Sequence, residues 1–379
     1  MRTYIREIFL IPLCLSTTMA CGEASSDEAS TPATAEEALI GQRGDGAVFT
    51  MSNAAAGNTV LAFHRMQDGS LEAAGEYPTG GLGSGASLGS QGSVTLSDDG
   101  HFLVVVNAGS DEISSFNVRG TQLTLRSRLP SGGSHPTSVA VRDHLAYVLN
   151  AGQDSNISGF WLDPLGRLFA IPGSTRALST SMPAPAQVAI SPKNLGVVVT
   201  EKGTSLIDTF AFRRNGTLDS AVTHASSGST PYGFDISEDG ILVVSEAAAG
   251  AASSYSLTGR GGFSTISASI SDNQKAPCWL VITKDGRFAY TTNAGSSSIS
   301  GYKVAHDGSL QLLDSNGVTA STGDNGKPLD VAVDHNHHLY AVDAGNHVID
   351  GFAIGNTGAL TPVASAMGMP KTMVGIAAL

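Results

Sequence analysis

Acidic and amide side chains recur at one fixed place along this chain, directly after a short apolar run and before a small polar turn. The positions are Asn53, Asn107, Asn150, Glu201, Glu246, Asn293 and Asp343. Turn formation alone explains the Asn positions, because Asn accepts hydrogen bonds from the nearby backbone. Glu is a poor turn residue, so Glu201 and Glu246 stand out. A carboxylate in such a place is a candidate general base, and we predict that role for Glu201.

Other residues that could bind a metal or act in catalysis have simpler explanations. Cys278 has no Cys or His at a ligand spacing, which favours a buried small side chain. The His-rich run at residues 334–338 invites a metal site, but a solvated turn is the better interpretation. The chain contains no CxxCH, HExxH, phosphate-loop or GxSxG motif. We therefore predict neither a metal nor a cofactor.

The secondary-structure elements that must position these residues recur as a repeat along the sequence. A polar-glycine turn followed by an apolar residue recurs at Leu71, Leu123, Leu168, Leu218, Phe263, Leu310 and Leu360. The apolar run with its polar turn, as in LVVVNAGS and AYTTNAGS, keeps step about 17 residues ahead. Each copy contains short β-rich runs separated by Asp-Gly or Asn-x-Gly turns, which predicts a four-stranded antiparallel sheet. A period of roughly 45–52 residues is typical of propeller blades, so we predict an all-β, seven-bladed β-propeller.

The two ends of the repeat indicate how the ring closes. The first copy begins with a second strand at residues 47–52, and no innermost strand precedes it. Residues 373–379 have the apolar alternation of the missing strand. Closure by this C-terminal strand would remove an exposed sheet edge. We predict one propeller domain over residues 47–379.

Propeller topology brings distant residues to the same face. The links into the innermost strands and the turns after the second strands emerge together, at the mouth of the central channel. His135 lies in one such link, so it is expected to share a face with Glu201 and to assist it in acid–base chemistry. Simple solvation is the alternative for a loop histidine. The predicted ligand-binding residues around this mouth are Glu246, Thr137, Asn150, Asn293 and Asp343.

The N-terminal segment has the features of an export signal. Residues 1–21 contain two arginines, an apolar run at 8–15 and a small-residue exit that ends at Cys21. The apolar run is far shorter than the ~20 residues of a transmembrane helix. Lipid attachment at Cys21 is the favoured interpretation, and ordinary signal cleavage is the alternative. Residues 22–46 are rich in Ser, Thr, Ala and Glu and are predicted to form a disordered acidic tether.

Composition narrows the partners and the compartment. A formal net charge of −12 argues against nucleic-acid binding. Only three cysteines are present, and loss of Cys14 with the signal and use of Cys21 as the anchor leave Cys278 alone. We expect an exported, monomeric protein of a bacterial cell envelope that touches the membrane only through its anchor.

The repeats resemble the seven-bladed lactonase-type propellers, a family that includes bacterial 6-phosphogluconolactonase and carboxymuconate cyclase. The strings SVTLSDDGHFLVVVNAGSDEISSFNV, SHPTSVAV and AYTTNAGSSSISGYKV carry the resemblance. It implies an active site of a His, an Arg and a Glu at the ends of strands near the channel. The Glu falls on Glu201, whereas the His and Arg positions hold Thr137 and Ala186. His135, two residues before Thr137, could replace the histidine, and nothing replaces the arginine.

Two functions therefore remain open. The first is a lactone hydrolase that acts on a non-phosphorylated lactone, because no cation is left to hold a phosphate. The second is a non-catalytic propeller that binds a glycan, a small ligand or a protein. The lost His and Arg favour the second function, and the retained Glu201 favours the first.

Overall fold

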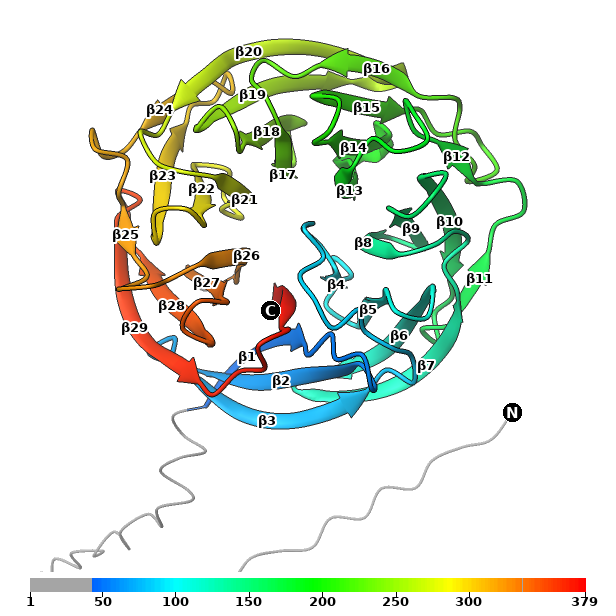
Figure 1. Ribbon diagram of the computed structural model, residues 1–379, viewed down its shortest axis with the longest axis horizontal. Coiled ribbons are helices and arrows are strands. Elements are labelled where there is room, and N and C mark those ends of the chain that lie inside the picture. The colour runs from blue at the N-terminus through cyan, green and yellow to red at the C-terminus, as the bar shows by residue number, and fades with distance from the viewer. Residues whose placement is uncertain (1–42, 336) are drawn as a thin grey trace, which may run out of the picture. The chain divides into compact units, whose positions relative to one another are not determined.

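The structure is a computed structural model that describes residues 43–335 and 337–379. Over these residues the chain forms seven antiparallel sheets arranged as blades around a central axis, as Figure 1 shows. The compact unit spans Gln42–Leu379. The predictions for the signal segment, Cys21 and the start of the tether lie outside the described residues. The predicted fold is confirmed.

Each blade has four strands in sequence order from the axis outward, which we call a to d. Strands a are β30 (Val374–Ala378), β4 (Val94–Leu96), β8 (Pro136–Arg142), β13 (Pro185–Ile190), β17 (Pro231–Ile236), β21 (Pro277–Ile282) and β26 (Pro328–Val333). Strands b are β1 (Arg43–Met51), β5 (Phe102–Asn107), β9 (Leu145–Asn150), β14 (Val197–Glu201), β18 (Ile241–Glu246), β22 (Phe288–Asn293) and β27 (His338–Asp343).

The outer half of each blade is more exposed. Strands c are β2 (Thr59–Met66), β6 (Glu112–Arg119), β10 (Asn156–Leu162), β15 (Leu206–Phe210), β19 (Ala251–Thr258), β23 (Ser298–Val304) and β28 (Val348–Ile354). Strands d are β3 (Leu71–Pro78), β7 (Gln122–Pro130), β11 (Leu168–Ala170), β16 (Val222–Ala225), β20 (Gly262–Ser271), β24 (Leu310–Leu312) and β29 (Leu360–Met367). Two short additional strands, β12 (Arg176–Ala177) and β25 (Ala320–Ser321), pair with β10 and β23.

Helical structure is minimal in the described part of the chain. It consists of the 3₁₀ turns η1 (Pro192–Asn194) and η2 (Gly259–Gly261). No helix within residues 43–335 and 337–379 is long and apolar enough to cross a membrane.

The recurring polar-glycine turn connects strands c and d and, in most blades, contacts the neighbouring blade. Its glycine has a positive φ, for example 75° at Gly216 and 85° at Gly308, which glycine adopts without steric cost. The carbonyl of Gly216 accepts a hydrogen bond of 2.6 Å from the Tyr147 hydroxyl of the preceding blade. The carbonyl of Gly308 accepts one of 2.7 Å from Ser254. The repeat that revealed the fold is thus also a blade-to-blade contact.

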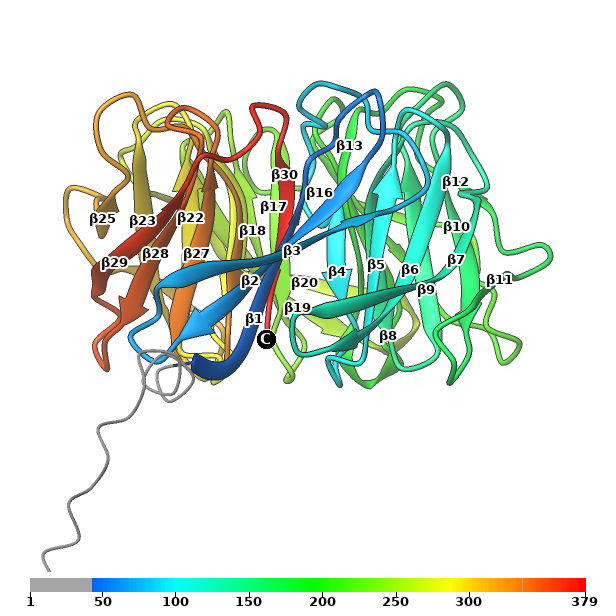
Figure 2. The ribbon, with the colours of Figure 1, turned by 90° about the horizontal axis from the view of Figure 1, so that it is seen from below.

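The ring closes as predicted, within the first blade. Strand β30 pairs with β1, with Ile376 opposite Thr50, and the Thr50 hydroxyl donates to the carbonyl of Gly375 at 2.6 Å. Figure 2 shows β30 running beside β1 toward the face where the chain ends. Turns between strands a and b, and between c and d, emerge on that face, which we call the a–b face. The opposite face carries the b–c turns and the d–a links.

A buried ion pair strengthens the same junction and corrects the prediction for residues 334–338. The Arg65 guanidinium, in blade 1, lies 3.0 Å from the Asp334 carboxylate, in blade 7, and both side chains are at most 5% exposed. The His338 ring lies 3.1 Å from the same carboxylate and is also buried. The run is therefore not simply a solvated turn, because two of its side chains clamp the last blade to the first. Among described residues no group of three or more His, Cys, Asp or Glu side chains could hold a metal ion.

Candidate functional site

The polar residues that end strands b lie inside the blades and do not line the channel mouth. Asn150 is 1% exposed, and Glu201, Glu246, Asn293 and Asp343 are fully buried. Their expected position around the mouth is therefore wrong. Each side chain lies against the start of strand c or the d–a link of its own blade. The repeat places them there because a b–c turn leaves backbone groups that need buried hydrogen-bond partners.

Glu201 binds the link that leads into its own blade. One carboxylate oxygen accepts a hydrogen bond of 2.9 Å from the backbone N–H of Ser179. The other accepts hydrogen bonds from the hydroxyls of Ser179 and Thr204, the latter at 2.6 Å. The carboxylate is thus engaged within the blade, away from solvent.

A second carboxyl group lies beside Glu201. Asp208, on β15, is fully buried, and neither of its oxygens accepts a well-formed hydrogen bond from a described residue. Burial, and then the Glu201 carboxylate, raise the pKa of Asp208 to about 7. Two buried carboxyls in contact are most stable when they share one proton. We assign Glu201 and Asp208 as such a proton-sharing pair.

The other blades use the same position for anchoring. Glu246 accepts hydrogen bonds from the Ser253 hydroxyl at 2.7 Å and from the Gly228 backbone N–H at 2.6 Å. Asp343 accepts hydrogen bonds from the backbone N–H groups of Lys327 and Gly345 at 2.7 and 2.8 Å.

Two of the four amides at this position also bind internal partners. The Asn293 side-chain amide donates to the Ser300 hydroxyl at 2.8 Å, and that of Asn150 donates to the Asn156 side chain at 3.0 Å. Glu201, Glu246, Asp343 and Asn150 therefore help to fix the links into strands a, whereas Asn293 binds strand c.

His135 and Thr137 are also held by the fold. His135 has a positive φ of 53°, and its backbone N–H donates to the Asp111 carboxylate at 2.6 Å. Thr137 is 1% exposed. Its carbonyl accepts a hydrogen bond of 2.8 Å from the Ser90 hydroxyl. No contact between His135 and Glu201 occurs in the described structure.

A segment of the chain itself closes the channel mouth. Residues 89–92, which we call the channel plug, lead into β4 and reach into the middle of the ring (Figure 1). The Gln91 side-chain amide donates to the carbonyl of Leu280 at 2.6 Å and accepts from its N–H at 2.9 Å, on a non-adjacent blade. The Gln91 backbone N–H donates to the carbonyl of Ala186 at 3.0 Å. The plug therefore covers both Thr137 and Ala186.

Two side chains from other blades bind the plug. The Trp279 indole N–H donates to the carbonyl of Ser90 at 2.8 Å. The Lys202 ammonium donates to the carbonyl of Gly89 and lies 4.7 Å from the centre of the Tyr232 ring. Burial lowers the pKa of Lys202. Cys278, beside this cluster, is buried as predicted, and burial raises the pKa of its thiol to about 12.

The channel is hollow beyond the plug, toward the a–b face. Two adjoining hollows of about 230 and 250 Å³ share Thr95, Gln187, Asp235 and Lys284. Together their walls include strand a residues from all seven blades.

Two carboxyl groups face this space. Asp330 is 3% exposed, and burial raises its pKa to about 7, against the effect of backbone N–H groups of Gly375 and Gly92. Asp235 accepts hydrogen bonds from the N–H groups of Ile282 at 2.9 Å and Ile236 at 2.8 Å, and burial raises its pKa.

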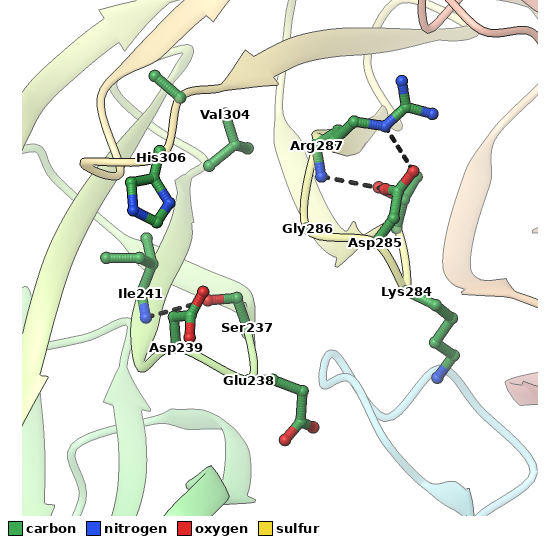
Figure 3. A pocket seen from close by; sticks show the side chains of 12 residues that line it. Ser237, Glu238, Asp239, Ile241, Lys284, Asp285, Gly286, Arg287, Val304 and His306 are labelled. Atoms are coloured by element: carbon green, nitrogen blue, oxygen red, sulfur yellow. Dashed lines mark hydrogen bonds and ion pairs between the residues drawn. The ribbon is translucent and has the colours of Figure 1, made fainter.

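Cations gather at the open end of the channel. Arg142 lies 3.3 Å from Asp98 and 3.2 Å from Glu238. Lys284 acts electrostatically on both Asp98 and Asp235, and no ion pair of Lys284 occurs within the described residues. Figure 3 shows its side chain extending from its turn toward the pale-blue segment of blade 2. This end thus combines carboxyl groups with a cation that has no fixed partner.

A third hollow, of about 260 Å³, lies between the a–b turns of blades 5 and 6. Lys284 lines this hollow as well, next to an ion pair in which the Arg287 guanidinium lies 2.6 Å from the Asp285 carboxylate (Figure 3). The Lys284 side chain therefore borders both the channel and this hollow.

Sequence reasoning missed the channel carboxyls and their cations. Asp235 and Asp330 each lie in the pattern of an apolar strand a, at PYGFDI and PLDVAV. A charged residue inside such a strand indicates a functional or structural role. The strand faces the axis, and burial of a carboxyl group is costly unless it has a partner. Arg142 ends a strand a and Lys284 follows one, and neither carries a comparable signal.

Comparison with known proteins agrees with the architecture. A candidate 6-phosphogluconolactonase from Bacteroides fragilis is 16% identical, with a TM-score of 0.66 over 88% of this chain and 98% of that one. The periplasmic gluconolactonase of Pseudomonas aeruginosa is 15% identical, with a TM-score of 0.65 over 86% and 98%. A protein from Lactobacillus plantarum is 17% identical, with a TM-score of 0.70 over 89% and 99%. At these identities the likeness concerns the fold. A search of curated proteins gave no match.

The sequence repeats carry a more specific relationship. The model of the family described as Lactonase, 7-bladed beta-propeller matches residues 49–164 and 241–373, well over half of the chain. These two stretches include residues 89–92 of the channel plug and the carboxyl group Asp330. The resemblance inferred from the repeats is confirmed: the chain belongs to the seven-bladed lactonase β-propeller family.

Proposed function

We propose that this protein is a lactone hydrolase that acts on a non-phosphorylated lactone from the a–b end of its channel. The observation that carries the proposal is the meeting of buried carboxyl groups with Lys284 in a hollow that is open to that face. Membership of the lactonase family supports the reaction class.

The chemistry needs a base and a stabiliser of negative charge. Asp235, as carboxylate, removes a proton from water, and the oxygen of that water bonds to the lactone carbonyl carbon. Lys284, with Arg142 at the rim, stabilises the resulting oxyanion. The ring C–O bond then breaks, and the ring oxygen leaves with the proton that Asp235 returns, giving a hydroxy acid. The raised pKa of Asp235 makes it a stronger base than a solvated Asp.

The size of the hollow and its charges limit the substrate. Each hollow of about 230–250 Å³ suits a small lactone. Arg142 is already paired with two carboxylates, and Lys284 alone is a weak phosphate site. A neutral lactone is therefore the proposed substrate class.

The test is acid release from a panel of neutral and acidic lactones in a pH-stat. We expect wild type to release acid, and Asp235→Asn and Lys284→Met to lose about 100-fold or more in kcat. Lys303→Met, at the exposed position of the otherwise buried strand β23, is the matched control and should retain full activity. Glu201→Gln should also retain it if the fold is kept, because its carboxylate is enclosed in the blade.

The outcomes separate two sites. Loss of turnover in Glu201→Gln, with Asp235→Asn active, would move the reaction to the plugged end and overturn the assignment. No release from any lactone would reject the hydrolase. The second candidate, a non-catalytic binding propeller, is favoured by the plug over Thr137 and Ala186, and it would then be pursued by ligand screens.

The cellular setting is a further part of the proposal. The export signal, the acidic tether and Cys21 support a lipid-anchored envelope protein, as does the periplasmic location of the Pseudomonas aeruginosa protein of the same fold. Mass spectrometry of the mature N-terminus checks this, since an unmodified Cys21 or cleavage elsewhere would contradict lipid attachment.

A further inference from the structure

A long groove lies on the a–b face, outside the channel, between blades 2 and 3. Its volume is about 1090 Å³, several times that of either channel hollow. It is formed by the a–b and c–d turns of the two blades, around Gly100, Gly120, His144 and Pro164, and by the C-terminal Leu379. A groove of this size and openness accommodates a chain of several units rather than a small lactone.

The groove carries two guanidinium groups. Arg119 and Arg126 line it together with His101 and His144, and Asp99 is the one acidic side chain of the lining. Asp99 is already bound to His101, with 3.0 Å between the carboxylate and the ring nitrogen. Two guanidinium groups in one groove are notable in a chain that has 21 Lys and Arg against 33 Asp and Glu.

The two arginines differ from most surface arginines of this propeller in their partners. Arg128, Arg167 and Arg287 each lie within 3.4 Å of a carboxylate. Within the described residues, neither Arg119 nor Arg126 has an ion pair.

Arg126 is nevertheless held in place. Its Nε–H donates to the carbonyl of Leu165 at 2.8 Å, and both terminal amino groups remain available. A guanidinium presented in this way matches a carboxylate by two parallel hydrogen bonds.

The remaining lining residues suit an acidic sugar better than a nucleic acid. Phe102 and Pro164 offer apolar surface to the C–H face of a sugar ring, and Asn117, Gln122 and Thr124 offer groups for its hydroxyls. No lysine lines the groove, and nucleic-acid sites depend on many phosphate contacts from Lys and Arg.

We propose that this groove binds an acidic oligosaccharide that carries carboxylate groups. Arg119 and Arg126 pair with the carboxylates, and the amide and hydroxyl side chains bind the sugar hydroxyls. The groove is separate from the channel hollows, so this inference does not rest on the lactone hydrolase.

Binding of tetragalacturonate to the full chain, measured by calorimetry, tests the site. Maltotetraose is the neutral ligand of equal length. Arg119→Glu, Arg126→Glu and the double variant are compared with Arg214→Glu, which changes the charge at an exposed turn in blade 4. Circular dichroism and thermal unfolding confirm that each variant is folded.

We expect saturable binding of the acidic sugar and no measurable binding of the neutral one. Affinity should fall between about 50 and about 300 mM salt. Each groove variant should lose about tenfold and the double variant more, while Arg214→Glu stays within about twofold.

Three results would overturn the proposal. The first is no binding of the acidic sugar, and the second is equal binding of the neutral one. The third is an equal loss in Arg214→Glu, which would indicate only the overall charge. Binding of a phosphopeptide or an oligonucleotide that depends on Arg119 and Arg126, without sugar binding, would reject the sugar class.

Discussion

Replacing Asp208 with Ser should make the propeller more stable at neutral pH and less sensitive to pH. Asp208 and Glu201 are fully buried carboxyls in contact, and Asp208 accepts no well-formed hydrogen bond from a described residue. Blade 5 contains the substituted arrangement already, because Ser253 occupies the matching place and donates to Glu246 at 2.7 Å. The substitution therefore rebuilds a pairing that this fold uses elsewhere.

The sign and size follow from the raised pKa of Asp208. The folded chain binds more protons than the unfolded chain between about pH 4 and pH 7, so the free energy of unfolding falls as the pH rises through that window. Each pKa unit is worth about 1.4 kcal/mol, and a shift from 3.8 to about 7 sets an upper limit of roughly 4 kcal/mol. Since this limit assumes that nothing around the carboxyl relaxes, we expect Asp208→Ser to recover about 1–3 kcal/mol at pH 8.

Guanidinium denaturation at about pH 5 and about pH 8, followed by tryptophan fluorescence, measures this difference. Wild type should lose stability between the two pH values, partly through Asp330 and Asp350, whose pKa values burial also raises, to about 7 and about 6. Asp208→Ser should lose less. A variant whose stability falls in parallel with wild type, or that is weaker at pH 8, would refute the proton-sharing pair.

Two other contacts give predictions. Asp334→Asn leaves Arg65 buried without its counter-charge, and we expect the free energy of unfolding to drop by about 3–5 kcal/mol in the same assay; a drop below about 1 kcal/mol would show that the pair does not hold the ring closed. Gln91→Ala removes both hydrogen bonds to Leu280 and should speed amide hydrogen exchange in residues 89–92, measured by mass spectrometry; unchanged exchange would mean that the plug is held by its backbone alone.

The fold could be predicted because its signal repeats. The turn before Leu310, for example, contains Gly308, whose positive φ favours glycine and whose carbonyl accepts a hydrogen bond from Ser254. A contact of this kind recurs in most blades, at Gly69, Gly166, Gly216 and Gly358, and leaves similar residues at each turn. The missing first strand was equally visible, since residues 373–379 have no other place to pair.

The candidate site could not be predicted in the same way. The prediction for Glu201 rested on its place after strand b, but a turn position does not say whether a side chain points to the channel or into its blade. Nor does the sequence reveal that Ser90 and Gln91 cross the ring to reach Trp279 and Leu280, 189 residues later. Contacts across the axis join non-adjacent blades, so no repeat records them.

The channel plug and the replacement of the family's histidine and arginine are related. Thr137 and Ala186 stand where the resemblance places a histidine and an arginine, and the carbonyls of both bind the plug. A bulky charged side chain at Ala186, which is fully buried beneath Gln91, would have no room beside the plug. The loss of the arginine and the presence of the plug are therefore structurally linked. If the protein hydrolyses lactones, its reacting groups must lie at the other end of the channel, where Asp235 and Lys284 face open space.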